Sequence, residues 1–167
     1  ERGNVLHDVL YVFWGQLGDS DALQSLSAHA LDERIASAVA KGLDGVAVNR
    51  RNALGRTYFE LEGKRLIALL KQWVAVEKKR SPFVVVAREQ DIQLQLGDLT
   101  LSMRADRIDE LPDGGRFVID YKSGLCSIQD WVGDRPAKPQ LPLYALAMSD
   151  TVAGLSYAQV RTDECKY

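Results

Sequence analysis

The stretch Phe117-Val118-Ile119-Asp120-Tyr121-Lys122-Ser123-Gly124 determines how the fold can be built. It starts as an aromatic and β-branched run, which favours a buried strand, and it ends in a serine and a glycine, which favour a loop. The turn signal Asp113-Gly114-Gly115 comes just before it, and residues 99–105 alternate apolar and polar side chains before that turn. The pattern therefore predicts a β-meander whose last strand ends near Lys122.

Outside this stretch, the spacing of apolar residues changes near Ser81-Pro82, from a helical pattern before that point to a strand pattern after it. Before that point apolar residues recur at spacings of three and four, which indicates buried helix faces. We expect three helices, over about residues 5–17, 21–41 and 53–79, with Gly42 ending the second and a loop over 43–52. After it we expect strand over 83–87 and 92–96, a helix over about 139–148 and a last strand over 155–160.

This order of elements predicts an α/β (α+β) domain, in which helices flank a mixed sheet and a helical segment comes first. We expect a single domain over residues 1–167, with a helical part over 1–80 and a sheet core over 83–167. No internal repeat, low-complexity tract or linker interrupts it.

Composition and charge narrow the classes of function. The chain is 46% hydrophobic and 26% charged, the balance of a soluble globular protein. Its net charge of −2 excludes a protein that binds nucleic acid over its whole surface, but leaves room for a local basic channel. Two cysteines are too few for a disulfide framework or a four-thiolate metal site. With no apolar run near the roughly 20 residues of a membrane span, no visible signal peptide and no initial Met, we expect a piece of a longer protein with no membrane partner.

Two carboxylates are expected to meet across the predicted hairpin. Asp106 and Asp120 are 14 residues apart with the glycine turn near their midpoint, so they lie opposite or nearly opposite each other. Like charges there repel, and a divalent cation between them removes the repulsion in an oxygen-rich site for Mg²⁺ or Mn²⁺. Lys122 points the same way as Asp120, so its ammonium can orient or deprotonate a water or stabilise charge developing on a phosphate. The backbone carbonyl of Tyr121 is a further possible ligand.

Four motifs, taken in order, resemble the PD-(D/E)xK nuclease superfamily and, more closely, its RecB/AddB-type nuclease domain. They are His7 on the first helix, Met103-Arg104-Ala105-Asp106-Arg107-Ile108-Asp109, Asp120-Tyr121-Lys122-Ser123-Gly124, and Gln140 with Tyr144. The family usually has glycine where this chain has Met103, a position that is not a metal ligand. Some members carry a four-cysteine iron–sulfur staple, which two cysteines cannot form alone.

The resemblance implies a restriction-endonuclease-like fold and assigns roles to individual residues. The implied metal ligands are His7, Asp106, Asp120 and the backbone carbonyl of Tyr121. Lys122 would be the catalytic lysine, acting with the two aspartates. Gln140 and Tyr144 lie four residues apart on one helix face, where they would line the site and contact the substrate phosphate or hold the loop.

Ordinary structural roles remain open for several of these charged residues. The set of Asp106, Asp120 and Lys122 could be a salt-bridge cluster on a sheet. Asp109 points away from Asp106 by strand alternation, which favours a salt bridge to Arg107 or Arg104 or a turn role. Arg107 fits an ion pair as well as it fits a DNA backbone contact. Glu89 ends a predicted strand, where the family often has an acidic residue, and could support the site.

Residues outside the motifs receive weaker assignments. Trp14 and Trp73 fit apolar helix faces, so core packing is expected, whereas Trp131 lies in a loop near the site and could stack on a base. Cys126 has no evident base partner and is assigned no chemistry. The basic run Lys78-Lys79-Arg80 fits a solvated helix end better than a phosphate contact.

The sequence thus predicts a Mg²⁺- or Mn²⁺-dependent DNA nuclease, of exonuclease or related type, that hydrolyses phosphodiester bonds. We expect it to belong to a larger cytoplasmic DNA repair or recombination protein, with DNA and a helicase motor domain or subunit as partners. The alternatives are a catalytically inactive DNA-binding domain of the same fold and a purely structural interaction domain. A domain of this family that has lost its activity in evolution should have lost Asp106, Asp120 or Lys122 first, and all three are present.

Overall fold

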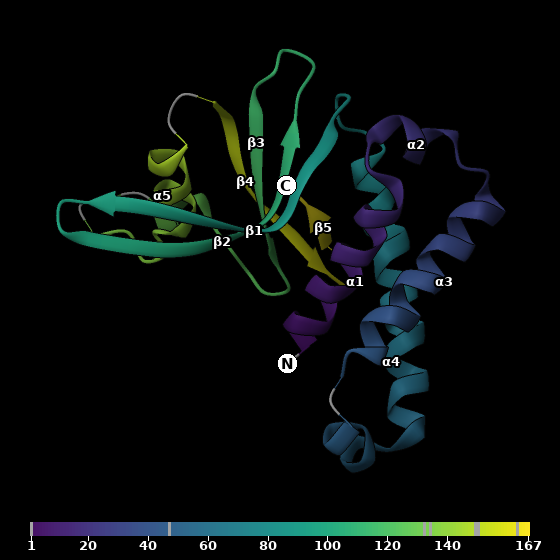
Figure 1. Ribbon diagram of the computed structural model, residues 1–167. Coiled ribbons are helices and arrows are strands. Elements are labelled where there is room, and N and C mark those ends of the chain that lie inside the picture. The colour runs from purple at the N-terminus through teal and green to yellow at the C-terminus, as the bar shows by residue number, and fades with distance from the viewer. Residues whose placement is uncertain (1, 47, 132, 134, 149–150, 163) are drawn as a thin grey trace.

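A five-stranded mixed sheet lies between two groups of helices (Figure 1). The computed structural model describes residues 2–46, 48–131, 133, 135–148, 151–162 and 164–167, and leaves the side chains of 2, 48–54 and 128 undescribed. The strands are β1 (Val84–Leu96), β2 (Leu99–Glu110), β3 (Arg116–Lys122), β4 (Val152–Arg161) and β5 (Glu164–Lys166), in that spatial order. The helices are α1 (Arg2–Leu17), α2 (Ser20–Ser25), α3 (Ala28–Asp44), α4 (Val48–Glu77), the 3-10 helix η1 (Ile128–Trp131) and α5 (Gln140–Ala147). The predicted fold class is confirmed.

The first helices differ in detail from the prediction. The expected helix over 21–41 is two helices, because Leu26 is extended and the Ser27 side chain caps a new helix by accepting a hydrogen bond from the amide of Ala30. The prediction that Gly42 ends a helix is wrong. Gly42 is packed against α1, where an added Cβ would lie 2.4 Å from a Val9 methyl, so glycine is needed here for close helix packing.

The expected loop over 43–52 is shorter than predicted, because α4 already begins at Val48. Within α4 the helix is interrupted at Gly55, where φ is +74°, a conformation that glycine adopts without the usual steric cost. The predicted start near residue 53 therefore lies close to this interruption and not at the beginning of α4.

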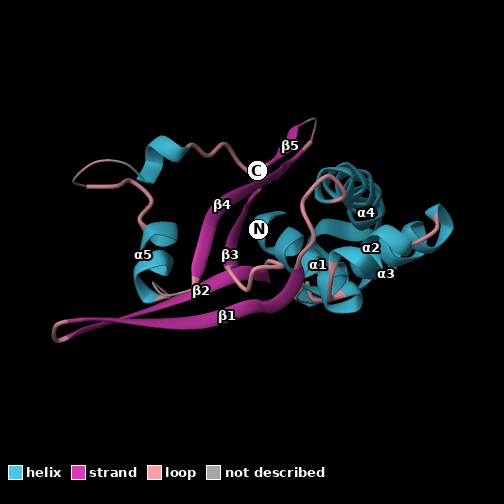
Figure 2. Cartoon of the chain, turned by 90° about the horizontal axis from the view of Figure 1, so that it is seen from above, coloured by secondary structure: helices cyan, strands magenta, loops and turns pink. Residues whose placement is uncertain are grey.

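The strands before the turn are longer than expected. The two stretches predicted over 83–87 and 92–96 are one strand, β1, which pairs antiparallel with β2 along almost its full length. Their outer halves form a β-hairpin arm that extends past the rest of the sheet (Figure 2). β2 pairs antiparallel with β3, and β3 pairs parallel with β4 after a crossover that contains α5. The short antiparallel strand β5 at the sheet edge was not predicted.

Two apolar cores lie on the two faces of the sheet. Helices α1, α3 and α4 cover one face and pack with Ile119, Tyr121 and Ala158. Helix α5 covers the other face, where Leu141 and Tyr144 pack with Val118 and Tyr157. Within the described residues, no helix is both long and apolar enough to cross a bilayer.

Candidate active site

Strands β2 and β3 direct alternate side chains to opposite faces of the sheet. Arg107 pairs with Ile119 in the ladder, and continuing that register by one residue puts Asp106 across from Asp120. The side chains of Arg107 and Tyr121, one residue further along each strand, therefore point to the face covered by α1 and α4. The hairpin spacing read from the sequence thus describes the backbone correctly.

A histidine and two carboxylates converge beside these strands. The ligand atoms of His7, Glu89 and Asp106 all lie within 4.8 Å of one another. His7 Nδ1 is 3.3 Å from Asp106 Oδ1 and 3.9 Å from Glu89 Oε1. Three elements thus supply one cluster: α1 brings His7, β1 brings Glu89 and β2 brings Asp106.

The Tyr121 backbone holds this cluster against the end of β3. The Nε2 atom of His7 is 3.1 Å from the Tyr121 carbonyl oxygen. The Tyr121 amide donates a 2.7 Å hydrogen bond to the second oxygen of Asp106. The carbonyl, imidazole and carboxylate that the sequence analysis grouped as ligands are therefore adjacent.

Glu89 reaches the cluster through an unusual backbone conformation. It lies inside β1, between Arg88 and Gln90, and not at the end of a strand as predicted. Its φ is +47°, the only positive φ that the described residues show outside glycine. Such a conformation costs a non-glycine residue free energy and is concentrated at functional sites. The acidic side chain of Glu89 indicated that it could support the site, but no sequence pattern indicates the positive φ that brings it there.

Asp120 is close to the cluster but has a partner of its own. It is buried, and its carboxylate forms an ion pair with Lys122, the lysine two residues along the same strand. Asp120 is not among the described residues whose ligand atoms lie within the 4.8 Å group. The strand register nevertheless places Asp106 across from Asp120, and the Asp106 charge contributes to raising the pKa of Asp120.

The electrostatics of the cluster are those of an anion-rich site. Burial raises the pKa of Asp120, and the Asp106 charge adds to this against the opposing effect of Lys122. Burial and then Asp106 also raise the pKa of Glu89. Burial would lower the pKa of His7, but Asp106, Glu89 and the Tyr121 carbonyl outweigh it and raise the pKa. Burial is thus the largest cause of the raised pKa of both carboxyls, and a neighbouring carboxylate adds to it in each case.

Gln140 and Tyr144 meet on α5 as their spacing predicts. The Gln140 side-chain amide donates a 2.6 Å hydrogen bond to the Tyr144 hydroxyl, which in turn donates to the backbone carbonyl of Arg104 on β2. Tyr144 is fully buried, and burial raises its pKa to about 12. Tyr144 therefore holds the strand that carries Asp106, and Gln140, which bonds to Tyr144, is half-buried.

A second polar cluster, which we call the buried network, occupies the opposite face of the same strands. Arg107 donates to both Asp109 oxygens at 2.6 and 2.7 Å and to Glu77 at 2.7 Å. Arg80 donates to Asp109 at 2.8 Å and to Glu77 at 2.9 Å. The Tyr167 hydroxyl donates to Glu77 at 2.7 Å. Arg107 is thus an ion-pair residue and Asp109 its partner, as one of the two sequence interpretations held.

The remaining candidates fall outside the cluster. Trp14 and Trp73 are core residues, and Arg107 stacks 3.8 Å above the Trp14 ring. Cys126 donates to the Gln159 side-chain oxygen at 3.5 Å, and burial raises its pKa, which favours the unreactive thiol. Arg80 is not a solvated helix end but a member of the buried network.

The donor set fits a hard divalent cation. Carboxylate and carbonyl oxygens suit Mg²⁺ or Mn²⁺, and one imidazole beside them is compatible with Mn²⁺ in particular. His7, Glu89 and Asp106 already present their ligand atoms together. The excess of negative charge in this cluster would stabilise a bound cation electrostatically.

Comparison with known proteins agrees with this geometry. A family model described as the PD-(D/E)XK nuclease superfamily matches residues 1–166. Two curated relatives, from Streptococcus equi subsp. zooepidemicus strains MGCS10565 and H70, are each named as a subunit of an ATP-dependent helicase/deoxyribonuclease. Each is 29% identical over 132 residues, which cover 75% of this chain and 12% of the relative. The chain therefore spans about an eighth of the length of these relatives.

Proposed function

The chain belongs to the PD-(D/E)XK nuclease superfamily, and on that premise we propose that it is a metal-dependent nuclease module that hydrolyses phosphodiester bonds in DNA. The observation that carries the proposal is the convergence of His7, Glu89 and Asp106, whose ligand atoms lie within 4.8 Å of one another next to Lys122 and Asp120. Neighbouring carboxylates without matching cations are costly, so their presence calls for a ligand that compensates them.

His7, Asp106, Asp120 and the Tyr121 carbonyl would hold Mg²⁺ or Mn²⁺, with Glu89 as a fourth side chain. A bound divalent cation supplies charge stabilisation for the phosphate and lowers the pKa of a bound water. Asp120 would turn from its Lys122 partner toward the cluster when the cation is present. His7 binds in its neutral form, and its contact with the Tyr121 carbonyl orients the ring.

Lys122 would provide the positive charge at the reacting phosphate. Its side chain is partly exposed, whereas the Asp120 carboxylate beside it is buried, so the ammonium is the group of this pair that a substrate can reach. An ammonium at that place stabilises charge that develops on the phosphoryl oxygens, or it orients the attacking water. Gln140 would contact the substrate phosphate, and Tyr144 would position β2 behind Asp106.

The wider assignment rests on the relatives. Both are named as helicase/deoxyribonuclease subunits, so we propose DNA as the substrate and a helicase motor domain or subunit as the partner. A role in DNA repair or recombination and a cytoplasmic location follow from the same proposal. Hydrolysis from a strand end, an exonuclease action, suits a nuclease that a motor supplies with DNA.

The test compares two variants of the Asp120–Lys122 pair. We expect Lys122→Ala to abolish cleavage of linear DNA with Mg²⁺ or Mn²⁺ while Mn²⁺ affinity, measured by calorimetry, stays near that of the wild type. Asp120→Ala should lose both cleavage and Mn²⁺ affinity. Lys71→Ala is the matched control, because Lys71 also pairs with an aspartate, Asp32 at 2.8 Å, but lies on α4. Equal loss of Mn²⁺ affinity in both pair variants would contradict the assigned roles.

The same experiment separates the alternative of an inactive DNA-binding domain. That alternative predicts DNA binding with no Mn²⁺-dependent cleavage of linear or circular, single- or double-stranded DNA by the wild type. EDTA should abolish cleavage if the proposed function is right.

A further inference from the structure

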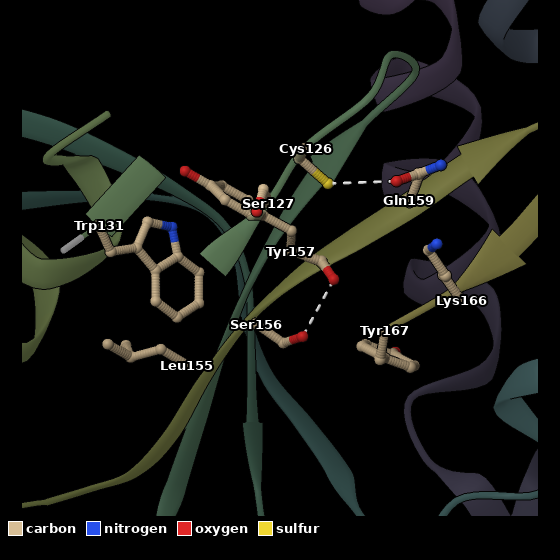
Figure 3. Close-up of a pocket in the computed structure, with 9 residues that line it drawn as sticks. All are labelled: Cys126, Ser127, Trp131, Leu155, Ser156, Tyr157, Gln159, Lys166 and Tyr167. Carbon is tan, nitrogen blue, oxygen red and sulfur yellow. Dashed lines mark hydrogen bonds between the residues drawn. The ribbon is translucent and has the colours of Figure 1, made fainter. Parts of the chain in front are cut away.

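A small pocket lies directly beside the candidate active site. It has a volume of about 250 Å³ and lies between the loop that carries η1 and the strands β4 and β5 (Figure 3). Pockets for whole small-molecule ligands measure about 300–1,000 Å³, so this one suits a single ring system rather than a complete cofactor.

The sheet register joins the pocket to the candidate active site. Asp120 pairs with Tyr157 across the parallel β3–β4 ladder, and Lys122 pairs with Gln159. Gln159 pairs in turn with Lys166 on β5. Paired residues share a face of the sheet, so Tyr157, Gln159 and Lys166 continue the rows that begin at Asp120 and Lys122. The Lys122 ammonium is 5.6 Å from the centre of the Tyr157 ring.

The lining combines aromatic rings with hydrogen-bonding and charged groups. Trp131 points into the pocket from η1 and lies opposite Lys166 (Figure 3). Its ring centre is 5.0 Å from that of Tyr157, at an angle of 60°. Lys138 approaches the same Tyr157 ring to 6.0 Å. Lys122 and Lys138 thus approach the Tyr157 ring, and Lys166 lines the pocket. Each of the three lysines also pairs with a carboxylate of its own, so an anionic ligand would share these ammonium groups with Asp120, Asp130 and Glu164. Aromatic rings beside ammonium groups match a ligand with a flat ring and negative charge.

We propose that this pocket binds the base of the nucleotide next to the scissile phosphate, in an unpaired segment of a DNA strand. Trp131 would be the stacking surface, and Lys166 would contact a flanking phosphate. The inference rests on the proposed function, because it takes the Asp120–Lys122 pair as the place of the scissile phosphate. A base within a duplex has both ring faces stacked, so only an unpaired or extruded base reaches the Trp131 ring.

The experiment measures binding without hydrolysis. Affinities of the whole chain for a fluorescent oligo(dT) are measured in EDTA for the wild type, Trp131→Ala, Trp131→Phe and Lys166→Ala. We expect Trp131→Ala to weaken binding about 5- to 150-fold, the effect of losing one base–aromatic stack, and Trp131→Phe to keep most of the affinity. Tyr58→Ala, which removes an aromatic ring on α4, is the control and should bind as the wild type does.

An abasic site moved along the oligonucleotide turns this into a double-mutant cycle. At one position, loss of the base should weaken binding to the wild type but not to Trp131→Ala. Equal effects on both proteins at every position would overturn the proposal. If Trp131→Ala does not fold, Lys166→Ala is the deciding variant, because the Lys166 side chain is exposed. We expect a smaller loss of affinity and a salt dependence that is reduced by about one phosphate contact. An unchanged salt dependence would overturn the proposal.

These outcomes are independent of catalysis. If Trp131 and a base are coupled but no DNA is cleaved, the proposed nuclease activity is wrong and the proposed base site is supported. If DNA is cleaved normally but Trp131 and a base are not coupled, only the proposed base site is wrong.

Discussion

The two faces of β2 and β3 hold two polar clusters of opposite character. On the α4 face, two arginines meet two carboxylates in the buried network, and each guanidinium donates at 2.6–2.9 Å to its partners. On the other face, Glu89, Asp106 and Asp120 lie near the positive charges of Lys122 and His7, and the Arg104 charge also acts on Glu89.

The difference separates charges that have the partners they need within the fold from charges that, on the proposed function, would bind a cation. A buried ion pair whose hydrogen bonds are all made is stable in place, although a well-packed apolar pair could do as well. Clustered carboxylates with too little positive charge cost free energy, which a bound cation would offset. One strand carries both kinds, since Asp106 and Asp109 are three residues apart.

The largest expected effect comes from neutralising the unbalanced face. Asp106→Asn should lower the cleavage rate by at least about 10³-fold, because a lost ligand removes several kcal/mol of transition-state stabilisation. The free energy of unfolding without metal should stay within about 1 kcal/mol of the wild type, since an amide oxygen can still accept from the Tyr121 amide. Cleavage assays and urea titration in EDTA measure the two effects. Retained cleavage would show that Asp106 is not a ligand.

The same substitution three residues later should act on folding instead. Asp109→Asn leaves one acceptor oxygen where Arg80 and Arg107 need two, and should lower the free energy of unfolding by about 3–5 kcal/mol. Cleavage per folded molecule should be largely kept. Urea unfolding is the measurement, with Asp91→Asn as control, because Asp91 pairs with Arg104 at the surface and should show no measurable change. A stable Asp109→Asn protein would contradict the comparison.

A smaller effect of opposite sign is expected at Glu89. Burial and the neighbouring Asp106 raise the pKa of Glu89, so its ionised form costs the folded state free energy. That cost is absent at low pH, where the carboxyl is protonated, and is fully present above the raised pKa. Glu89→Gln should therefore stabilise the metal-free protein at pH 7 by about 0.2–1 kcal/mol, as for like charges across strands. Thermal unfolding in EDTA measures it, and added Mn²⁺ should stabilise the wild type more than the variant.

The smallest effect concerns pH and His7. Burial would lower the pKa of His7, yet Asp106, Glu89 and the Tyr121 carbonyl raise it, so protonation stabilises the metal-free folded state. The contribution is complete below the pKa of the unfolded chain and disappears as the pH rises through the raised pKa. His7→Gln should flatten this part of the stability profile. His29→Gln is the control, since His29 is an exposed residue on α3, and an equal flattening there would contradict the role of His7.

Much of the site was predictable because its residues are close in sequence or obey strand geometry. The alternation of DRID and DYK along two strands sorts Asp106, Asp120 and Lys122 from Arg107, Asp109 and Tyr121 without reference to anything else. The spacing around the glycine turn sets the register. The motif order supplied His7 and the Gln140–Tyr144 pair.

Other features depend on distant segments. Glu89 enters the cluster only through a left-handed turn inside β1, and the buried network draws Glu77 from α4 and Tyr167 from beyond β5. Gly42 looked like a helix end, and only its packing against Val9 shows otherwise. The ladder of β3 with β4 and β5 brings Tyr157 and Lys166 beside Asp120 and Lys122.

The sequence by itself determined the fold class, the two strands that carry Asp106 and Asp120, and the face to which the side chains of these strands point. Period and turn spacing are local properties of the chain, so they can be read without the tertiary structure. Tertiary structure decided which distant charges meet those side chains, because a pairing between α1, β1, α4 and β5 depends on how elements pack and leaves no periodic trace in the sequence. It thereby decided on which face of the strands the arginines and carboxylates balance one another and on which face the carboxylates are in excess.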